Sequence, residues 1–328
     1  EGYATKAYIR QFEEFILKKY KEKINIVVKN VSDPQEFYDG IRSKKIDLIS
    51  PAHNIPKSHK WNMIRNEMVL PLNLGNIPNY KNIIQAIQKI HSVASFKAVY
   101  GVPIVYGPYG LFYNTNIIKE EPKSWNIFWK EKWKGKYSIS SDYHEANIYS
   151  TLLAIGIPAE HIFDISAAST SLAKQKLRYL AQNAANFWVG VDSAEKLKGL
   201  AFATGWGFSL PALKKLGENW KLASPKEGTT GWVDHWMIGY SLKDKPKLKL
   251  YAEEWINFSI SPGIQASYVK NIAQFPVNTK VKSLLTEEQI KQFHLDDPKY
   301  VKNNLILWRV LPRAEQDGFK HLWQKAKQ

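Results

Sequence analysis

The chain has 328 residues, enough for two lobes that each have a hydrophobic core, and its 44% hydrophobic and 23% charged residues are ordinary values for a globular protein. It contains no cysteine, which excludes disulfides, thiolate metal sites and cysteine nucleophiles. The formal net charge of +16 would suit a nucleic-acid-binding protein, but the lysines are spread along the whole chain without a binding-module signature, so we expect no nucleic-acid partner.

The first predicted element begins almost at once. Over residues 5–22 apolar side chains recur every three or four positions, which predicts an amphipathic helix. Residues 24–28 are then predicted to form a short buried strand. No run of about 18 apolar residues occurs, and residues 1–4 are not a signal peptide, so a signal or anchor, where encoded, has been removed.

A second pair of elements follows. Residues 33–42 are predicted to form a helix that Ser32 or Asp33 caps, with acidic and amide side chains in its first turn. Residues 46–50 are predicted to form a second strand. Helices that alternate with strands indicate a largely parallel sheet covered on both faces, which binds ligands at the carboxyl ends of its strands.

Glycine and proline in residues 103–110 interrupt this alternation, and we predict that the chain crosses to a second lobe here. The second lobe is predicted to contain strands at 111–114, 137–141, 186–190, 201–206 and 220–223, and helices at 144–155, 170–183 and 193–200. From residue 251 onward the chain is predicted to be mainly helical. It ends in an amphipathic helix that carries Phe319, Leu322 and Trp323.

The two crossings define the predicted division into α/β lobes. The first lobe comprises residues 1–108 and about 236–280, the second about 109–235 and 281–328, and the hinge crossings lie near 106–111 and 232–237. A ligand held between two hinged lobes would be buried when they close.

The most informative stretch is residues 225–234, Pro-Lys-Glu-Gly-Thr-Thr-Gly-Trp-Val-Asp. Alternation along an extended segment places Trp232 and Asp234 on the same side. An aromatic face attracts an organic cation, and a carboxylate accepts its N–H donors. The alternative is a surface turn beside a buried tryptophan, because a chain with 12 tryptophans also produces Trp-x-Asp by chance.

Asp142 and Glu145 lie three residues apart at the start of a predicted helix, a spacing that brings both carboxylates to one side of the first turn. They could hold an amine there, or they could be an ordinary helix cap with an acidic first turn. His144 lies between them, and together the three side chains could resemble the ligands of a metal ion. A histidine at a helix start is more often solvent-facing, however, so we expect no metal site.

Four more stretches complete an ordered set of motifs, at residues 110–114, 124–136, 142–145 and 255–262. With residues 225–234, this set resembles the extracellular solute-binding proteins of ABC importers, specifically the spermidine/putrescine-binding branch. The similarity covers nearly the whole chain. It implies an α/β, two-lobed periplasmic-binding-protein fold of type II, in which each lobe is a mainly parallel sheet flanked by helices, with a hinged cleft between the lobes.

The resemblance also implies the ligand-binding residues, which are Tyr3, His53, Asp142, Glu145, Trp206, Trp232, Asp234, Gln274 and Arg309. The three acidic residues would hold amine nitrogens between the walls formed by Trp206 and Trp232. Gln274 is explained equally well as a solvated loop amide.

Two positions depart from the pattern of that branch. His53 stands where an aromatic hydroxyl is favoured, and Arg309 replaces an uncharged amide. Arg309 could point away from the site, pair with Asp142 or Asp234, or bind a carboxylate of the ligand.

The function implied is that of a bacterial periplasmic or surface-tethered protein that captures a small organic cation, such as putrescine or spermidine, and delivers it to an ABC importer permease. The alternative is the same protein as a polyamine-sensing module coupled to a membrane signalling protein. Iron-binding relatives of this fold use paired tyrosines, for which Tyr106 and Tyr109 are candidates, although hinge packing explains them equally well.

Further expectations concern catalysis and assembly. No nucleophile–base motif or phosphate-binding loop is present, so we expect neither an enzyme nor a cofactor. We expect a monomer. Because the resembled family has an extended segment before its first helix, we also expect a first strand ahead of Glu1.

Overall fold

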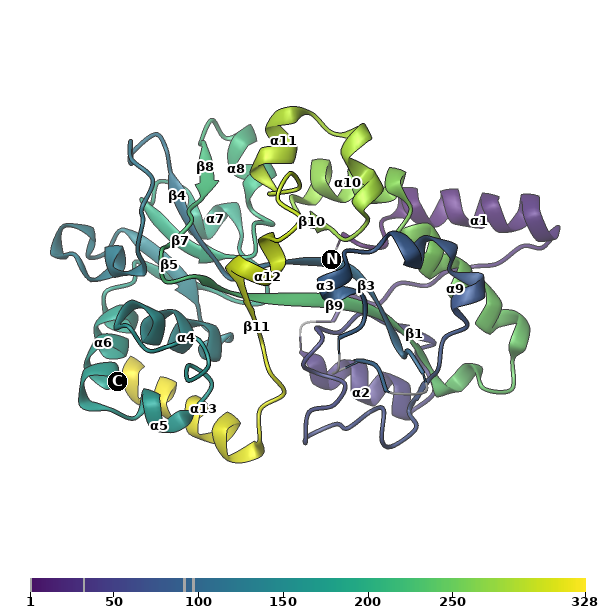
Figure 1. The fold of residues 1–328 in the computed structure, drawn as a ribbon, viewed down its shortest axis with the longest axis horizontal. Coiled ribbons are helices and arrows are strands. Elements are labelled where there is room, and N and C mark those ends of the chain that lie inside the picture. The colour runs from purple at the N-terminus through teal and green to yellow at the C-terminus, as the bar shows by residue number, and fades with distance from the viewer. Residues whose placement is uncertain (1, 32, 91–92, 96–97) are drawn as a thin grey trace. The chain divides into compact units, whose positions relative to one another are not determined.

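The computed structural model describes residues 2–31, 33–90, 93–95 and 98–328 (Figure 1). The chain divides into two compact units. Unit 1 comprises Glu1–Tyr106, Val233–Asn271 and Phe275–Pro298, and unit 2 comprises Gly107–Trp232, Ile272–Gln274 and Lys299–Gln328. Residues 281–298 thus belong to unit 1, whereas the sequence predicts them in the second lobe. The hinge itself stays a prediction.

The chain passes between the units within two strands, β3 (Gly101–Pro108) and β9 (Thr229–Gly239). Every residue of β3 is buried, so the glycines and prolines up to Pro108 form part of a strand, which the sequence does not predict. On one side of β3 the short strand β10 (Phe275–Pro276) pairs with Val105 and Tyr106 and leaves Pro103 unopposed by a residue of β10.

The first sheet follows the order β1-β9-β3-β10, with two further strands paired to β9. These strands are β1 (Leu48–Ile49), β2 (Val69–Leu70) and β11 (Leu305–Leu307). In unit 1, β1 and β2 run antiparallel to the second half of β9. In unit 2, β11 runs parallel to its first half. Strand β9 is therefore the central strand on which the candidate residues Trp232 and Asp234 lie.

The helices of unit 1 are α1 (Lys6–Tyr20), α2 (Pro34–Arg42), α3 (Gln85–Gln88), α9 (Pro246–Ser259), α10 (Pro262–Ile272) and α11 (Glu287–Gln292). The last residue of α10, Ile272, is assigned to unit 2. Side chains cap the first turns of α1 and α2. The Thr5 side chain accepts a hydrogen bond in the first turn of α1. Asp33 and Glu36 form a capping box at α2, and Ser32 lies outside the described residues.

Packing in unit 1 follows the apolar faces of these helices. The centroid of the Phe12 ring of α1 lies 5.2 Å from that of the Trp255 ring of α9, and the two helices are in contact. Figure 1 shows α1 and α9 in the same part of unit 1. Short 3₁₀ helices complete the unit at Leu74–Asn76, Pro78–Asn82, Tyr240–Leu242 and Thr279–Leu284.

The predicted buried strand at residues 24–28 is wrong. The segment forms no strand, and Val27 is 83% exposed. An apolar, β-branched run becomes a strand only when a second strand pairs with it, and the sequence of the run does not contain that information.

The second sheet lies entirely in unit 2 and has the order β6-β5-β7-β4-β8. Its strands are β4 (Gly110–Asn114), β5 (Tyr137–Ser140), β6 (Asn186–Trp188), β7 (Phe202–Gly205) and β8 (Trp220–Leu222). Strands β5, β6 and β7 are parallel, whereas β4 is antiparallel to both β7 and β8. The sheet is mixed, not mainly parallel, because β4 lies between β7 and β8 and runs antiparallel to both.

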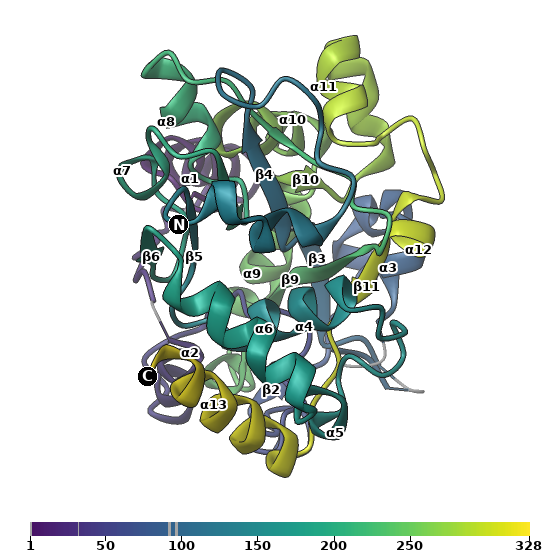
Figure 2. The same cartoon turned by 90° about the vertical axis from the view of Figure 1, so that its left-hand side faces the viewer.

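The helices of unit 2 are α4 (His144–Ala154), α5 (Ile165–Ala168), α6 (Ser171–Gln182), α7 (Ala194–Leu197), α8 (Leu210–Lys215), α12 (Tyr300–Asn304) and α13 (Arg313–Lys327). Two 3₁₀ helices span Trp125–Trp129 and Glu131–Trp133. Helix α13 packs along α4 and α6 and brings Phe319, Leu322 and Trp323 into the core, as the sequence predicts (Figure 2).

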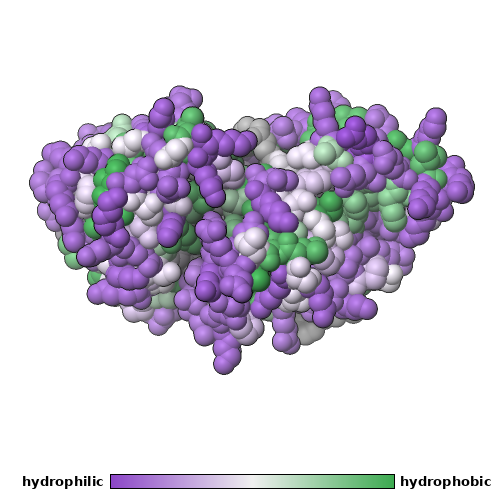
Figure 3. Space-filling view, turned by 90° about the horizontal axis from the view of Figure 1, so that it is seen from above, coloured by the Kyte–Doolittle hydropathy of each residue, from purple (hydrophilic) through white to green (hydrophobic). Residues whose placement is uncertain are grey.

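Hydrophilic side chains cover most of the face shown in Figure 3. Within the described ranges, none of the helices combines the length and the apolar character needed to cross a membrane.

Candidate ligand-binding site

Aromatic rings surround Trp206 in unit 2. We name this group the Trp206 cluster; its ring centroids lie 4.8 to 5.8 Å from that of Trp206 and belong to Tyr109, Tyr143, Trp188, Trp232 and Trp308. Trp206 and Trp232 are 7% and 5% exposed, and Tyr143 and Trp308 are half-buried. The structure therefore brings together both tryptophans that the sequence predicts as aromatic walls.

The parallel strands of unit 2 explain this gathering. Trp188 ends β6, Trp206 directly follows β7, and Tyr143 lies three residues after the end of β5. Because carboxyl ends of parallel strands meet at one edge of a sheet, the three rings converge there.

Gln274 lies against Trp206. Its amide nitrogen donates to the carbonyl oxygens of Trp206, at 3.3 Å, and of Ile272, at 3.1 Å. Two carbonyls on one side fix the orientation of the amide, because only the NH₂ group can face them. Gln274 is 1% exposed, so it is not a solvated loop amide.

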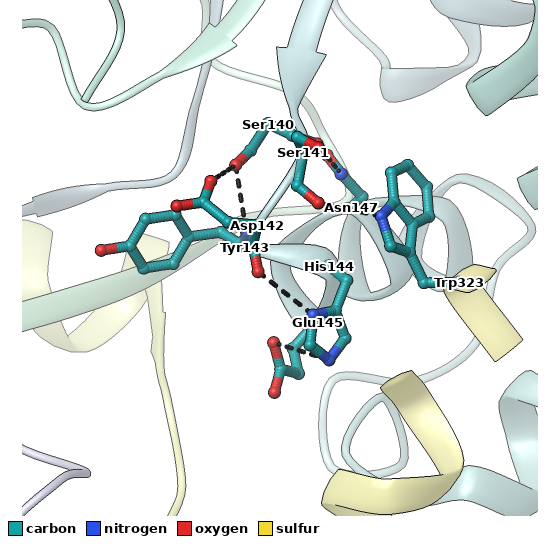
Figure 4. Close-up of polar contacts among 8 residues, drawn as sticks. All are labelled: Ser140, Ser141, Asp142, Tyr143, His144, Glu145, Asn147 and Trp323. Atoms are coloured by element: carbon teal, nitrogen blue, oxygen red, sulfur yellow. Dashed lines mark hydrogen bonds and ion pairs between the residues drawn. The ribbon is translucent and has the colours of Figure 1, made fainter. Parts of the chain in front are cut away.

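Asp142 and Glu145 are at the start of α4 but turn to different partners (Figure 4). The Asp142 carboxylate accepts hydrogen bonds from Ser140 Oγ at 2.8 Å and from Gly190 N–H at 2.9 Å. The Glu145 carboxylate lies 3.3 Å from His144 Nε2. Asp142 connects to the Trp206 cluster through Gly190, whose carbonyl accepts from Trp206 Nε1 at 3.1 Å.

A second group of candidate residues lies in unit 1. Tyr3 Oη donates to Asp234 Oδ2 at 2.8 Å, and Tyr268 Oη in turn donates to the Tyr3 carbonyl at 2.9 Å. Asp234 is half-buried, and burial raises the pKa of its carboxyl to about 7, against the opposing effect of the Tyr3 hydrogen bond. Among the described residues, no lysine or arginine side chain forms an ion pair with Asp234.

His53 contacts the backbone between Trp232 and Asp234. The backbone N–H of His53 donates to the Val233 carbonyl at 2.8 Å, and the Nδ1 atom of its imidazole accepts from the backbone N–H of Val233 at 3.2 Å. His235 lies beside the same carbonyl, with Nδ1 at 3.1 Å. Burial, assisted by His53, lowers the pKa of His235 to about 3, so this imidazole is neutral at physiological pH and donates to the carbonyl.

Arg309 is apart from both groups. Its guanidinium donates to the Glu160 carbonyl at 3.2 Å and lies 4.9 Å from the centroid of the Phe163 ring. Of the three arrangements that the sequence leaves open, the structure does not have the one in which Arg309 pairs with Asp142 or Asp234. Its part in ligand binding stays a prediction.

The chemistry of Tyr109 does not favour iron binding. Its hydroxyl donates to Asn147 Oδ1 at 2.7 Å, lies 2.7 Å from Thr204 Oγ1, and is fully buried. Burial raises the pKa of the phenol above its usual range, which disfavours the phenolate that a ferric ion requires. In the described part of the chain no three histidine, aspartate or glutamate side chains gather as a metal site.

Sequence reasoning missed Tyr143, Trp188 and Trp308 as members of the Trp206 cluster. The signal was available for the first two, since Trp188 lies in a predicted strand of the second lobe and Tyr143 lies two residues after another. Trp308 lies on the segment after β11. Its backbone N–H donates to the Gly231 carbonyl, and no local sequence pattern predicts this long-range hydrogen bond.

Comparisons with known proteins identify the family and the fold of this chain. The sequence model of a family described as bacterial extracellular solute-binding proteins matches residues 43–304. The spermidine/putrescine-binding periplasmic protein of Escherichia coli strain K12 is 22% identical over 93% of this chain and 84% of its own length.

Solved structures show the same fold. A putative spermidine/putrescine ABC transporter protein from Listeria monocytogenes superposes with a TM-score of 0.77 at 20% identity, covering 99% of this chain and 96% of that one. The spermidine/putrescine ABC transporter substrate-binding protein of Streptococcus pneumoniae gives 0.77 at 20% identity, covering 99% and 95%. These matches confirm the predicted two-lobed α/β fold and the resemblance inferred from the motifs, whereas the prediction that each sheet is mainly parallel is wrong.

The family description also confirms two functional predictions, an extracytoplasmic location and a binding role without catalysis. With most of its length matched by the family model, the chain belongs to the bacterial extracellular solute-binding proteins.

Proposed function

We propose that this protein binds a polyamine such as putrescine or spermidine and delivers it to an ABC importer. The observation that carries the proposal is Asp234, a half-buried carboxylate without a lysine or arginine partner among the described residues of a chain that has 46 such side chains. A partly buried carboxylate is costly unless a cation pairs with it. An amine of the ligand would supply that cation.

The Trp206 cluster suits the rest of such a ligand. Trp232 precedes Asp234 by two residues on the same strand, so a cation bound at the carboxylate has an aromatic face beside it. Rings also cover the apolar methylene groups that separate the nitrogens of a polyamine. The walls proposed for the ligand are Trp206 and Trp232.

Asp142 and Glu145 supply further acceptors for a ligand nitrogen. Each oxygen of Asp142 accepts one hydrogen bond within the protein, and a carboxylate oxygen can accept two. The side chain of Glu145 is 31% exposed and therefore remains accessible. We propose that Tyr3 orients Asp234, that Gln274 orients Trp206 and that His53 holds the strand between Trp232 and Asp234.

Delivery to an importer is favoured over a sensor by the relatives. One of the two solved proteins is described as a putative spermidine/putrescine ABC transporter and the other as the substrate-binding protein of a spermidine/putrescine ABC transporter. The proposal therefore includes an importer permease as the partner of this protein.

Isothermal titration of the purified protein with putrescine, spermidine and a monoamine of matched length tests the proposal. We expect saturable binding of the polyamines. The monoamine should bind much more weakly, because it has only one positive charge that can pair with the acidic residues. Equal affinity for the monoamine, or no binding of either polyamine, would overturn it.

A further inference from the structure

Asp192 is a buried carboxylate next to Trp206 that the predicted binding site does not include. It follows β6, is 3% exposed, and accepts four hydrogen bonds. Its Oδ1 accepts from the N–H groups of Trp206 at 2.6 Å and Gly207 at 3.2 Å. Its Oδ2 accepts from Ser209 N–H at 2.9 Å and from Ser209 Oγ at 2.6 Å.

The backbone around Trp206 needs such a restraint. Gly205 and Gly207 flank the tryptophan, and Gly207 has a φ of +93°, a conformation that glycine adopts without strain. Two glycines leave the orientation of an unrestrained ring poorly determined. A Cβ at Gly205 would lie 3.0 Å from Asp192 Cγ, so glycine at this position permits the close approach of the carboxylate.

Every polar group of Trp206 is held by the protein, and Asp192 restrains the backbone directly. The Trp206 N–H donates to Asp192, its carbonyl accepts from Gln274, and its indole N–H donates to the carbonyl of Gly190. Gly190 and Asp192 belong to the same short loop, which Asp142 fixes through the N–H of Gly190. The loop therefore connects the proposed ligand acceptor Asp142 with the proposed aromatic wall Trp206.

We infer that Asp192 is a positioning residue that sets the orientation of the Trp206 ring for the ligand. The inference rests on the proposed function for its effect on affinity, whereas the ordering of Trp206 is independent of any ligand. A residue that acts only through Trp206 must lose its effect when that ring is removed.

The first test is a double-mutant cycle for spermidine affinity. We expect Asp192→Asn, which sets an NH₂ group against N–H donors, to weaken binding about tenfold in the parent protein and less than about twofold in the Trp206→Ala background. Ser209→Ala is the matched control, because it removes one hydrogen bond of Asp192 and keeps those to Trp206 and Gly207. Additive losses, or unchanged affinity in Asp192→Asn, would overturn the inference.

The second test needs no ligand. In protein labelled with fluorotryptophan, the ¹⁹F resonance of Trp206, assigned through Trp206→Phe, should shift or broaden in Asp192→Asn and stay in place in Ser209→Ala. An unmoved resonance in Asp192→Asn contradicts the positioning role. A moved resonance in a protein that binds no amine supports the positioning of Trp206 and rejects the proposed ligand class, so the two failures are distinguishable.

Discussion

Asp234 is the residue on which the proposed chemistry depends most. Its carboxyl accepts from the Tyr3 hydroxyl, lies half-buried on β9 and has a pKa near 7, whereas an exposed aspartate has a pKa near 4. The burial that raises this pKa also strengthens the attraction of the ionised carboxylate for a cation, because less water screens the charges.

Replacing Asp234 with asparagine removes the charge and keeps the shape of the side chain. We expect Asp234→Asn to weaken spermidine binding by about 2–4 kcal/mol, since a partly buried ammonium group would lose its charge partner. Isothermal titration measures the loss. Asp317→Asn, at a side chain that is 70% exposed on α13, is the control and should leave affinity unchanged. Equal affinities for the parent and Asp234→Asn would reject the assigned site.

The raised pKa of Asp234 predicts a pH dependence of binding. Below about pH 7 the carboxyl is mostly protonated and neutral, so a cation must displace a proton to bind. Amines with pKa values near that of lysine stay charged throughout this range. Spermidine affinity should therefore rise by up to about tenfold per pH unit below pH 7 and level off above it. Titrations from pH 5.5 to 8.5 measure this profile, and a flat profile in the parent protein, matching that of Asp234→Asn, would contradict it.

Arg309 is expected to contribute little. Its guanidinium lies over Phe163 and donates to the Glu160 carbonyl, and the residue is exposed. Because such surface substitutions usually change free energies by about 0.5 kcal/mol or less, Arg309→Gln should change spermidine affinity by no more than about twofold. Titration with spermidine and with a zwitterionic amine checks this, and a loss of binding to the zwitterionic amine alone would assign Arg309 to a ligand carboxylate.

Among the secondary-structure elements, strand β9 determines how the candidate residues lie. It pairs with β1, β2, β3 and β11, and all of its residues except Asp234 are buried. His53 adds a side-chain acceptor for Val233 N–H and a backbone donor for the Val233 carbonyl. His53 is therefore hydrogen-bonded to both peptide groups that join Val233 to Trp232 and Asp234.

Removal of the His53 imidazole should destabilise this strand. His53→Ala leaves the buried Val233 N–H without its acceptor, and we expect a loss of about 1–3 kcal/mol in the free energy of unfolding. Urea denaturation measures it, with His161→Ala, at a side chain that is 60% exposed, as the control. If both variants unfold at the same urea concentration as the parent, His53 does not support β9.

The sequence predicts most elements of unit 2 to within a few residues, because strands and helices alternate there with clear changes of hydrophobic period. It fails at residues 24–28, where strand formation depends on a partner strand that local composition does not reveal. At residues 103–110 the sequence predicts a break in the alternation of helices and strands, and the structure adds that residues up to Pro108 belong to a buried strand within which the two units divide.

The site shows the same division between local and long-range information. Trp232 and Asp234 follow from alternation along one strand, and their placement on β9 agrees with the motif. Asp192 carries no motif, since its role depends on a loop after β6 meeting the glycines around Trp206 after β7. The resemblance identifies the position of Arg309 in the sequence. It does not predict that the guanidinium contacts the Glu160 carbonyl and the Phe163 ring, which belong to a distant segment.

At the scale of the whole molecule, the formal charge of +16 does not oppose the binding of a cation. Surface lysines farther than about 8–10 Å from a carboxylate are screened at physiological ionic strength, so the charges close to the ligand determine its affinity. That the protein functions as a monomer stays a prediction.

The central claim is that the folded protein selects polyamines, and ligand-dependent thermal stability tests it most directly. A ligand at 100 times its dissociation constant stabilises a folded protein by about 2.7 kcal/mol, which raises the melting temperature by several degrees. We expect this shift with putrescine, spermidine or norspermidine, and not with amino acids or ferric iron. A shift produced by an amino acid or by iron, with none from any polyamine, would contradict the account.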